Sequence, residues 1–256
     1  MKLSARLQQI CDQLTPGCRF ADIGSDHALL PVAAVLSGQA ASAVAGEVNE
    51  GPYEAAKRQV AQSGLNSRIS VRKGNGLEVI DPGEVEVITI AGMGGALMVS
   101  ILSQGISKLN GVKRLILQPN VGEDLVRRWL LEEGWYLSAE HILEEDGKIY
   151  EILTADRLEK AEAAALNEEL YRERLIPGCS QVLNVERLLL MGPRLSEAPV
   201  PVFFAKWDSE ISKLMKVRSQ ISKSELEASR LKEEEMRVQI EEWKEVLSCM
   251  QKDRRS

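Results

Sequence analysis

Residues 18–28 read CRFADIGSDHA, a short apolar segment that ends on an acid and turns at Gly24. The apolar part, 18–23, predicts a β-strand because turn signals bound it on both sides. A helical pattern at 29–37 follows the glycine turn. This order of strand, glycine turn and helix is the unit from which open parallel α/β sheets are built.

The same unit recurs along the first half of the chain. Strand patterns occur at 42–47, 69–72, 85–90 and 114–118, and turn residues and helical spacing separate them. Two further strands, at 135–143 and 148–154, are joined across the hairpin signal EDG. A nicotinamide-type dinucleotide fold ends instead on a sixth parallel strand. The sequence therefore predicts an α/β protein with a doubly wound, Rossmann-like sheet of the class I methyltransferase type that ends in an antiparallel hairpin.

Composition divides the chain into three segments. Residues 1–155 form the predicted sheet domain, and residues 156–202 carry the proline and glycine punctuation of a connector that we expect to pack on it. Residues 203–256 contain no Gly and two apolar seams at coiled-coil spacing. The seams are out of phase across a polar break at 222–229, which predicts an antiparallel helical hairpin. One stuttering helix is the alternative.

Charge and cysteine usage exclude several classes of protein. Lys and Arg number 32 against 38 Asp and Glu, and this net charge of −6 argues against binding nucleic acid through bulk positive charge. The four cysteines form no C-x-x-C pair, so we expect no metal and reduced thiols. No apolar run reaches the length of a membrane span. We therefore expect a cytoplasmic protein without a membrane partner.

Polar residues stand where the predicted strands end. Asp22 and Glu47 close the first two strands, and Asn75 follows the third. Strand ends form the ligand crevice of an open parallel sheet, where one acid can accept ribose hydroxyls and another can receive an amino group. Asp26 stands where the dinucleotide fingerprint has a glycine, and its charge would repel a pyrophosphate. A cationic ligand without phosphates, such as S-adenosylmethionine, is favoured.

The fourth predicted strand ends in AGMGG at 91–95. Methyltransferases of nucleobase nitrogens often carry an Asn/Asp-Pro-Pro-aromatic turn at this point, and this chain lacks it. Three glycines in four positions expose backbone groups and leave room for a planar base. The alternative is a simple strand-to-helix turn.

With these motifs the chain resembles the bacterial tRNA (adenine-22-N1)-methyltransferase family. The resemblance rests on ADIGSDHALLP (21–31), AGE (45–47), SGLNS (63–67), TIAGMGG (89–95), LILQPN (115–120) and EEDGKIYE (144–151). It implies S-adenosylmethionine as methyl donor, no metal, and tRNA as partner, with methylation at N1 of adenine 22 in the D-arm. Asn75 departs from the Asp that members of the family tend to carry.

The motifs and the resemblance together define the expected site. Asp26 is the expected catalytic residue, because a carboxylate can face the positive charge that develops on the base. N1 lies on the Watson–Crick edge, so the base must be unpaired or flipped before it reacts. The residues expected to bind the cofactor are Asp22, Gly24, Ser25, His27, Glu47, Asn75, Gly76, Ala91, Gly92 and Met93.

Other interpretations stay open. A methyltransferase of a small molecule or a protein could use the same residues, and a coiled coil could belong to a non-catalytic scaffold. The C-terminal segment is either an arm along the tRNA or a spacer or dimerising hairpin, with a monomer favoured over a dimer. The cations expected to meet the tRNA backbone are Arg6, Lys57, Arg58, Arg68, Arg72, Lys73, Arg127, Arg128 and those of the C-terminal segment.

Overall fold

The computed structural model describes residues 2–222 and 227–253. The chain forms two compact units, Met1–Leu170 and Tyr171–Ser256. The boundary between them falls inside the segment that the sequence predicts to be a connector. The long helix of that segment belongs to the first unit, and its short strands and short helices belong to the second.

The first unit contains a seven-stranded sheet in the order β3-β2-β1-β4-β5-β7-β6. Its strands are β1 (Cys18–Ile23), β2 (Ala40–Glu47), β3 (Ile69–Lys73), β4 (Val87–Met93), β5 (Arg114–Pro119), β6 (Tyr136–Glu145) and β7 (Lys148–Asp156). Strands β1 to β5 run parallel, and β7 runs antiparallel to both β5 and β6. The predicted Rossmann-like sheet with a terminal antiparallel hairpin is therefore confirmed.

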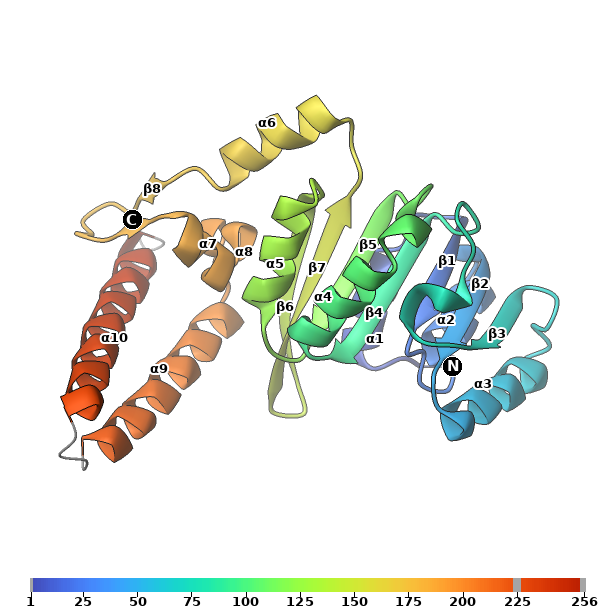
Figure 1. The fold of residues 1–256 in the computed structure, drawn as a ribbon, viewed down its shortest axis with the longest axis horizontal. Coiled ribbons are helices and arrows are strands. Elements are labelled where there is room, and N and C mark those ends of the chain that lie inside the picture. The colour runs from blue at the N-terminus through green and yellow to red at the C-terminus, as the bar shows by residue number, and fades with distance from the viewer. Residues whose placement is uncertain (1, 223–226, 254–256) are drawn as a thin grey trace. The chain divides into compact units, whose positions relative to one another are not determined.

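Helices cover both faces of this sheet. The helices of the first unit are α1 (Ala5–Asp12), α2 (Leu29–Leu36), α3 (Glu50–Gln62), α4 (Gly95–Gln104), α5 (Glu123–Glu132) and α6 (Lys160–Leu170), with 3-10 turns η1 (Gly76–Val79) and η2 (Ile106–Leu109). In Figure 1, α4 and α5 lie in front of the sheet, and α1 and α2 lie behind it. The recurring strand-helix pattern is broken after β3, where η1 replaces a full helix. Pro82 follows closely and has no N–H with which to extend one.

The core follows from the alternation of side chains along the central strands. Val87 of β4 belongs to the apolar cluster that contains Leu30 of α2 and Val60 of α3. Ile88 and Ile90 are also fully buried, and they point to the opposite face because successive side chains alternate along a strand. Apolar side chains on both faces of β4 are therefore buried, and this places the site at the end of the strand.

The second unit contains a pair of long helices, α9 (Pro201–Ile221) and α10 (Glu227–Asp253). The rings of Trp207 and Trp243 meet edge to face with centroids 4.9 Å apart, and Arg218 pairs with Glu233. The residue numbers of the contacts therefore decrease along α10 as they increase along α9, so the two helices are antiparallel. The predicted helical hairpin is confirmed and the single stuttering helix is wrong. Of the predicted polar break, residues 223–226 lie outside the described residues.

Shorter elements complete the second unit. They are β8 (Arg174–Leu175), β9 (Val182–Leu183), α7 (Val185–Met191) and α8 (Pro193–Glu197). The strands β8 and β9 pair antiparallel across the segment that contains Pro177 and Gly178. Across both units, none of the helices in the described residues combines the length and the apolar character needed to cross a membrane.

A buried ion-pair cluster joins α5 to the terminal hairpin. The side chain of Arg127 is 0% exposed, and its guanidinium donates to Glu140 at 2.6 Å and to Glu151. The two glutamate side chains are each 1% exposed. Arg127 therefore cannot meet a tRNA backbone, and its expected place among the tRNA-binding cations is wrong.

We expect Arg127→Met to lower the free energy of unfolding by about 3–5 kcal/mol, because two buried carboxylates lose the charge that compensates them. Combining Arg127→Met with Glu140→Gln and Glu151→Gln removes the whole cluster and should restore most of that loss. Urea denaturation of the three proteins measures the difference. A cost below about 1 kcal/mol for the single variant would show that the cluster is solvated rather than buried.

Candidate functional site

The carboxylate of Asp22 is buried at the end of β1, with 4% of the residue exposed. The hydroxyl of Thr89, its neighbour in β4, donates to one oxygen at 2.6 Å, and the hydroxyl of Ser25 donates to the other at 2.7 Å. Burial raises the pKa of Asp22, and the two hydrogen bonds oppose that shift only in part. A buried acid whose hydrogen-bond partners here are neutral hydroxyls is suited to receive a cation.

The turn after β1 is tightly folded. Gly24 has φ +70°, a left-handed backbone angle that favours glycine, and a Cβ on it would lie 2.3 Å from the methyl carbon at the end of the Met93 side chain. The backbone N–H groups of Gly24 and Ser25 both donate to the carbonyl oxygen of Gly46 on β2. This places Met93, from the end of β4, directly against the β1 turn.

Three residues after this turn keep left-handed backbone angles, which is costly for residues other than glycine. The φ angles of Asp26, His27 and Ala28 are +39°, +64° and +54°. Such strain persists where the surrounding structure enforces it and is concentrated at functional sites. Here it brings the N–H of Asp26 to the carboxylate of Glu47 at 2.5 Å.

Glu47 closes β2 and is 6% exposed. Burial raises its pKa, and the N–H of Asp26 lowers it in part. The side chains of Asp26 and His27 are 84% and 56% exposed, and they lie 3.5 Å from each other. The backbone of Asp26 therefore holds Glu47, while its own carboxylate faces solvent.

Asn75 and Gly76 stand beyond the end of β3. The N–H of Asn75 donates to Glu78 at 3.1 Å, which fixes the start of η1, and the residue is exposed. Gly76 has φ +54°, and a Cβ on it would lie 2.9 Å from Ile101 of α4. The packing against α4 therefore explains a glycine at position 76, whether or not the residue contacts a ligand.

The end of β4 differs from the expected loop, because the strand continues through Ala91 and Gly92 to Met93. A register irregularity between Ala91 and Met93 lets the chain bend there. The side-chain oxygen of Gln118 accepts the N–H of Gly92 at 3.2 Å, and the side-chain amide of Asn120 donates to the carbonyl of Gly92 at 2.8 Å. Two side chains from the end of β5 thus fix the glycine-rich segment.

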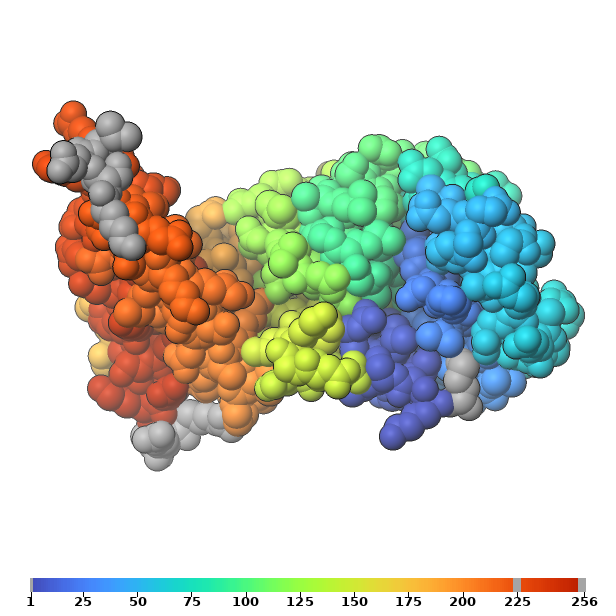
Figure 2. Space-filling model, turned by 90° about the horizontal axis from the view of Figure 1, so that it is seen from below, coloured from blue at the N-terminus to red at the C-terminus, as the bar shows by residue number. Residues whose placement is uncertain are grey.

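Arg6 of α1 joins the same network. Its guanidinium donates to the side-chain oxygen of Gln118 at 2.6 Å and lies 5.3 Å from the centre of the Tyr150 ring. Its charge also lowers the pKa of Asp22, against the larger effect of burial. The side chain of Glu145 accepts the backbone N–H groups of Ala5 and Arg6, and Figure 2 shows the tip of the β6–β7 hairpin beside the N-terminal segment.

The structure thus brings most of the expected site residues together. The segments 22–27, 47 and 91–93 meet at the carboxyl ends of β1, β2 and β4 through the contacts described above. Sequence reasoning gave no role to Thr89, Gln118 or Asn120, and considered Arg6 only as a tRNA-binding cation. A signal for Gln118 was present, since a polar residue ends the apolar run of β5, where 0% of it is exposed.

We expect Gly95→Ala to lower the free energy of unfolding by about 1–3 kcal/mol, because its Cβ would lie 2.1 Å from the carbonyl oxygen of Gly122. Gly51→Ala is the matched control in a helix. Nothing lies within 4 Å of the Cβ position of Gly51, so we expect Gly51→Ala to raise the free energy of unfolding by about 0.4–1 kcal/mol, because alanine restricts the unfolded chain. Chemical denaturation compares the two, and equal effects would contradict the close approach of α4 to the loop after β5.

Comparison with known proteins identifies the family. Residues 20–245 match the family model TrmK, tRNA (adenine(22)-N(1))-methyltransferase. The chain is 45% identical over 248 residues to the Bacillus subtilis tRNA (adenine(22)-N(1))-methyltransferase, covering 96% of this chain and 98% of that protein. The crystal structure of the B. subtilis enzyme superposes with a TM-score of 0.83 at 44% identity, over 96% of this chain and 99% of that one. A Streptococcus pneumoniae candidate tRNA (m1A22) methyltransferase in complex with S-adenosyl-L-methionine gives a TM-score of 0.77 at 39% identity, over 96% and 100%. The chain belongs to the tRNA (adenine(22)-N(1))-methyltransferase family.

Proposed function

We propose that this chain transfers a methyl group from S-adenosylmethionine to N1 of adenine 22 in tRNA. The observation that carries the proposal is the pair of buried acids, Asp22 and Glu47, at adjacent strand ends in a chain of this family. Composition alone argued against a nucleic-acid substrate. Asp22 and Glu47 lie buried at the carboxyl ends of β1 and β2, where they suit a cationic cofactor rather than a phosphate backbone.

The residues present fit S-adenosylmethionine. We assign the Asp22 carboxylate to the cofactor's amino group and the Glu47 carboxylate to its ribose hydroxyls. Support comes from their burial, their raised pKa values and the glycine turn at Gly24, which lets a ligand approach the backbone. Ser25, His27, Asn75, Gly76 and Ala91 remain proposed contacts at the same strand ends.

The cofactor supplies an electrophilic methyl group on a cationic sulfur. N1 of adenine carries a lone pair at neutral pH, so the chain needs no strong base, and the methylated base takes over the positive charge. The work of the protein is to hold the base in line with the methyl group and to face the new cation with negative or dipolar groups. We propose Asp26 for the second task, since its carboxylate is exposed beside the site.

Gln118 and Asn120 are proposed as positioning residues. They hold both the N–H and the C=O of Gly92, and Arg6 anchors Gln118 from the other side. These contacts fix the backbone at Gly92 and Met93, against which a planar base can pack. We propose that this segment takes the place of the proline-rich turn that methyltransferases of nucleobase nitrogens often carry.

Several of the Lys and Arg side chains that are expected to contact the tRNA backbone already pair with carboxylates. Arg72 binds Glu84 through both terminal nitrogens, and Lys57 and Lys73 pair with Glu54 and Glu50. To contact a tRNA phosphate, each of these side chains must first give up its carboxylate partner. We therefore propose that tRNA affinity is modest and strongly salt-dependent.

We also propose a role for each segment of the chain. Residues 1–155 form the cofactor domain, residues 156–202 form a connector, and residues 203–256 form an arm along the tRNA.

We expect Asp22→Asn to separate stability from binding. A raised pKa in the folded state means that the folded chain holds the proton more tightly than the unfolded chain does. The contribution of Asp22 to stability is therefore present at low pH and is lost as pH rises through its folded pKa. At pH 7.5 the neutral amide should raise the melting temperature of the cofactor-free protein, and the gain should vanish toward pH 4.

Asp22→Asn should weaken cofactor binding although it raises the melting temperature. Loss of a charge-assisted contact should weaken S-adenosylmethionine binding by about 10- to 100-fold in calorimetry. Thr89→Val is the companion variant, since it leaves the carboxylate but removes one donor, and its effect on binding should be smaller. A destabilised Asp22→Asn protein with unchanged affinity would make Asp22 a structural residue only.

The function itself is tested by incubating the protein with labelled methyl donor and a tRNA transcript that carries adenine at position 22. We expect label in 1-methyladenosine, and none with a transcript that carries guanine at that position. Label in another nucleoside would overturn the proposed target. Label in a protein or small molecule instead of tRNA would favour the alternative substrate class.

The same assay examines Asp26. We expect Asp26→Asn to keep cofactor affinity and to lower turnover by about 10-fold or more, because the charge facing the product is lost. Asp146→Asn is a matched control, since Asp146 is also exposed and has φ +51°, at the tip of the β6–β7 hairpin. Loss of cofactor affinity in Asp26→Asn would make Asp26 a cofactor-binding residue.

A further inference from the structure

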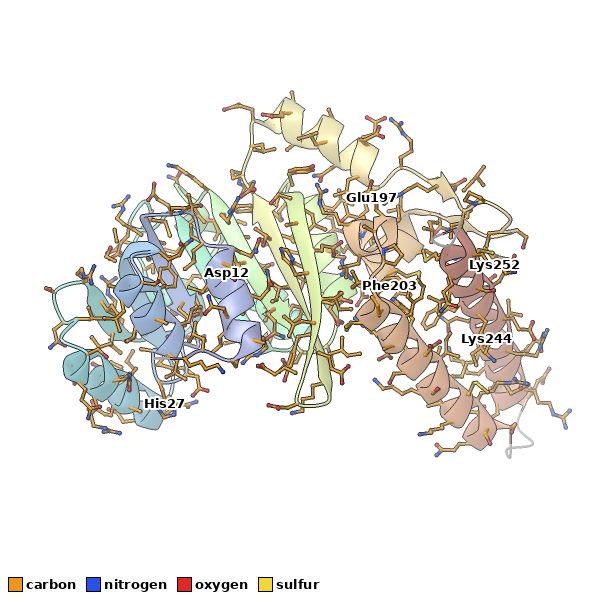
Figure 3. All side chains as sticks on the ribbon, turned by 180° about the vertical axis from the view of Figure 1, so that it is seen from behind. Asp12, His27, Glu197, Phe203, Lys244 and Lys252 are labelled. Carbon is orange, nitrogen blue, oxygen red and sulfur yellow. The ribbon has the colours of Figure 1, made fainter. Side chains whose placement is uncertain are left out.

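The second unit contains a cluster of metal-binding side chains that the methyl-transfer site does not use. Cys179 lies between β8 and β9, and Glu245 and Cys249 lie one helical turn apart on α10. Residues spaced by four on a helix share a face, so both α10 side chains point to the same side. Figure 1 places β8 beside the carboxyl-terminal end of α10, where Figure 3 labels Lys252.

The three ligand atoms are at distances that suit one small cation. The two sulfurs and a carboxylate oxygen all lie within 4.8 Å of one another, and the Cys179 sulfur lies 3.8 Å from Oε1 of Glu245. In a tetrahedral site with metal–sulfur and metal–oxygen bonds of about 2.3 and 2.1 Å, sulfur and oxygen ligands lie about 3.6 Å apart. The cluster therefore needs little rearrangement to close on a metal.

Neighbouring groups hold the carboxylate in place. The N–H and the hydroxyl of Ser180 both donate to Oε1 of Glu245, at 2.8 and 2.6 Å. Outer hydrogen bonds of this kind orient metal ligands in known sites. The nearby Lys252 supplies a positive charge beside Cys249 that partly offsets two thiolates and a carboxylate.

We propose that Cys179, Glu245 and Cys249 bind one thiophilic divalent cation, with Zn²⁺ as the best chemical match. Two thiolates and a carboxylate leave a fourth tetrahedral position for water. On binding, each thiol releases its proton to solvent and its sulfur forms a bond to the metal. The bound cation ties the segment between β8 and β9 to α10 within the second unit. This site is independent of the proposed methyl transfer.

Metal binding suits the cluster better than a disulfide. Cys179 and Cys249 are both free thiols in the structure. A disulfide would join only the two sulfurs, whereas a cation would also bind the carboxylate of Glu245, which already lies 3.8 Å from the Cys179 sulfur. A metal ion employs all three side chains.

The test uses the reduced, metal-free full chain titrated with Co²⁺, whose thiolate complexes absorb in the near ultraviolet. We expect a charge-transfer band that saturates at one equivalent, visible bands typical of tetrahedral Co²⁺, and their loss on adding Zn²⁺. Zn²⁺ should also slow alkylation of Cys179 and Cys249 by about 10-fold or more, read residue by residue by mass spectrometry. This second measurement needs no variant.

Matched variants locate the site. Cys179→Ser and Cys249→Ser should abolish the band, and Glu245→Gln should weaken Co²⁺ binding by about 10-fold or more. Cys11→Ala and Cys18→Ala change the buried thiols of the first unit, and Glu241→Gln changes an exposed acid of α10; all three should keep the band. No band in the unaltered chain, a band that survives both serine variants, or a Cys179–Cys249 disulfide formed in place of the complex would each overturn the proposal.

Discussion

The buried carboxylate of Asp22 is the constraint around which the first unit is arranged. It lies at the end of β1 and accepts two hydrogen bonds, one from the hydroxyl of Ser25 in the following turn and one from the hydroxyl of Thr89 in β4. These bonds make the acid tolerable inside the sheet, but burial still raises its pKa, so the cofactor-free chain carries an electrostatic cost there. The proposed binding of a cationic cofactor would relieve that cost, so stability would be partly traded for affinity at this position.

The rest of the site is built from backbone rather than from side-chain charge. The left-handed run at 26–28 brings the N–H of Asp26 to Glu47, and the end of the Met93 side chain lies against Gly24. Gln118 and Asn120 then fix Gly92 from β5. Each strand end therefore depends on its neighbour, and a ligand that binds one end meets a surface already set by the others.

The sequence predicts those parts of the site whose signals are local. Asp22, Gly24 and Glu47 are recognisable because an acid or a glycine stands where an apolar strand ends, and the doubly wound sheet with its terminal hairpin follows from the recurring pattern. The roles of Gln118 and Arg6 are not recognisable in this way, since they depend on the register of β5 against β4 and on where α1 packs. Arg127 is wrongly expected to meet the tRNA for the same reason, because its two acidic partners lie on the later hairpin.

Cys179 and Cys249 also illustrate that a local sequence pattern does not reveal contacts between residues that lie far apart in the chain. A metal site is visible in a sequence when its ligands recur at short, fixed spacing, as in a C-x-x-C pair. Cys179 and Glu245 lie 66 positions apart, and only the antiparallel pairing of α9 and α10 brings the end of the chain back to the segment between β8 and β9. The absence of a local motif therefore excludes only sites built from neighbouring residues. A helical hairpin returns the chain on itself, so ligands can assemble at its open end without leaving a sequence pattern.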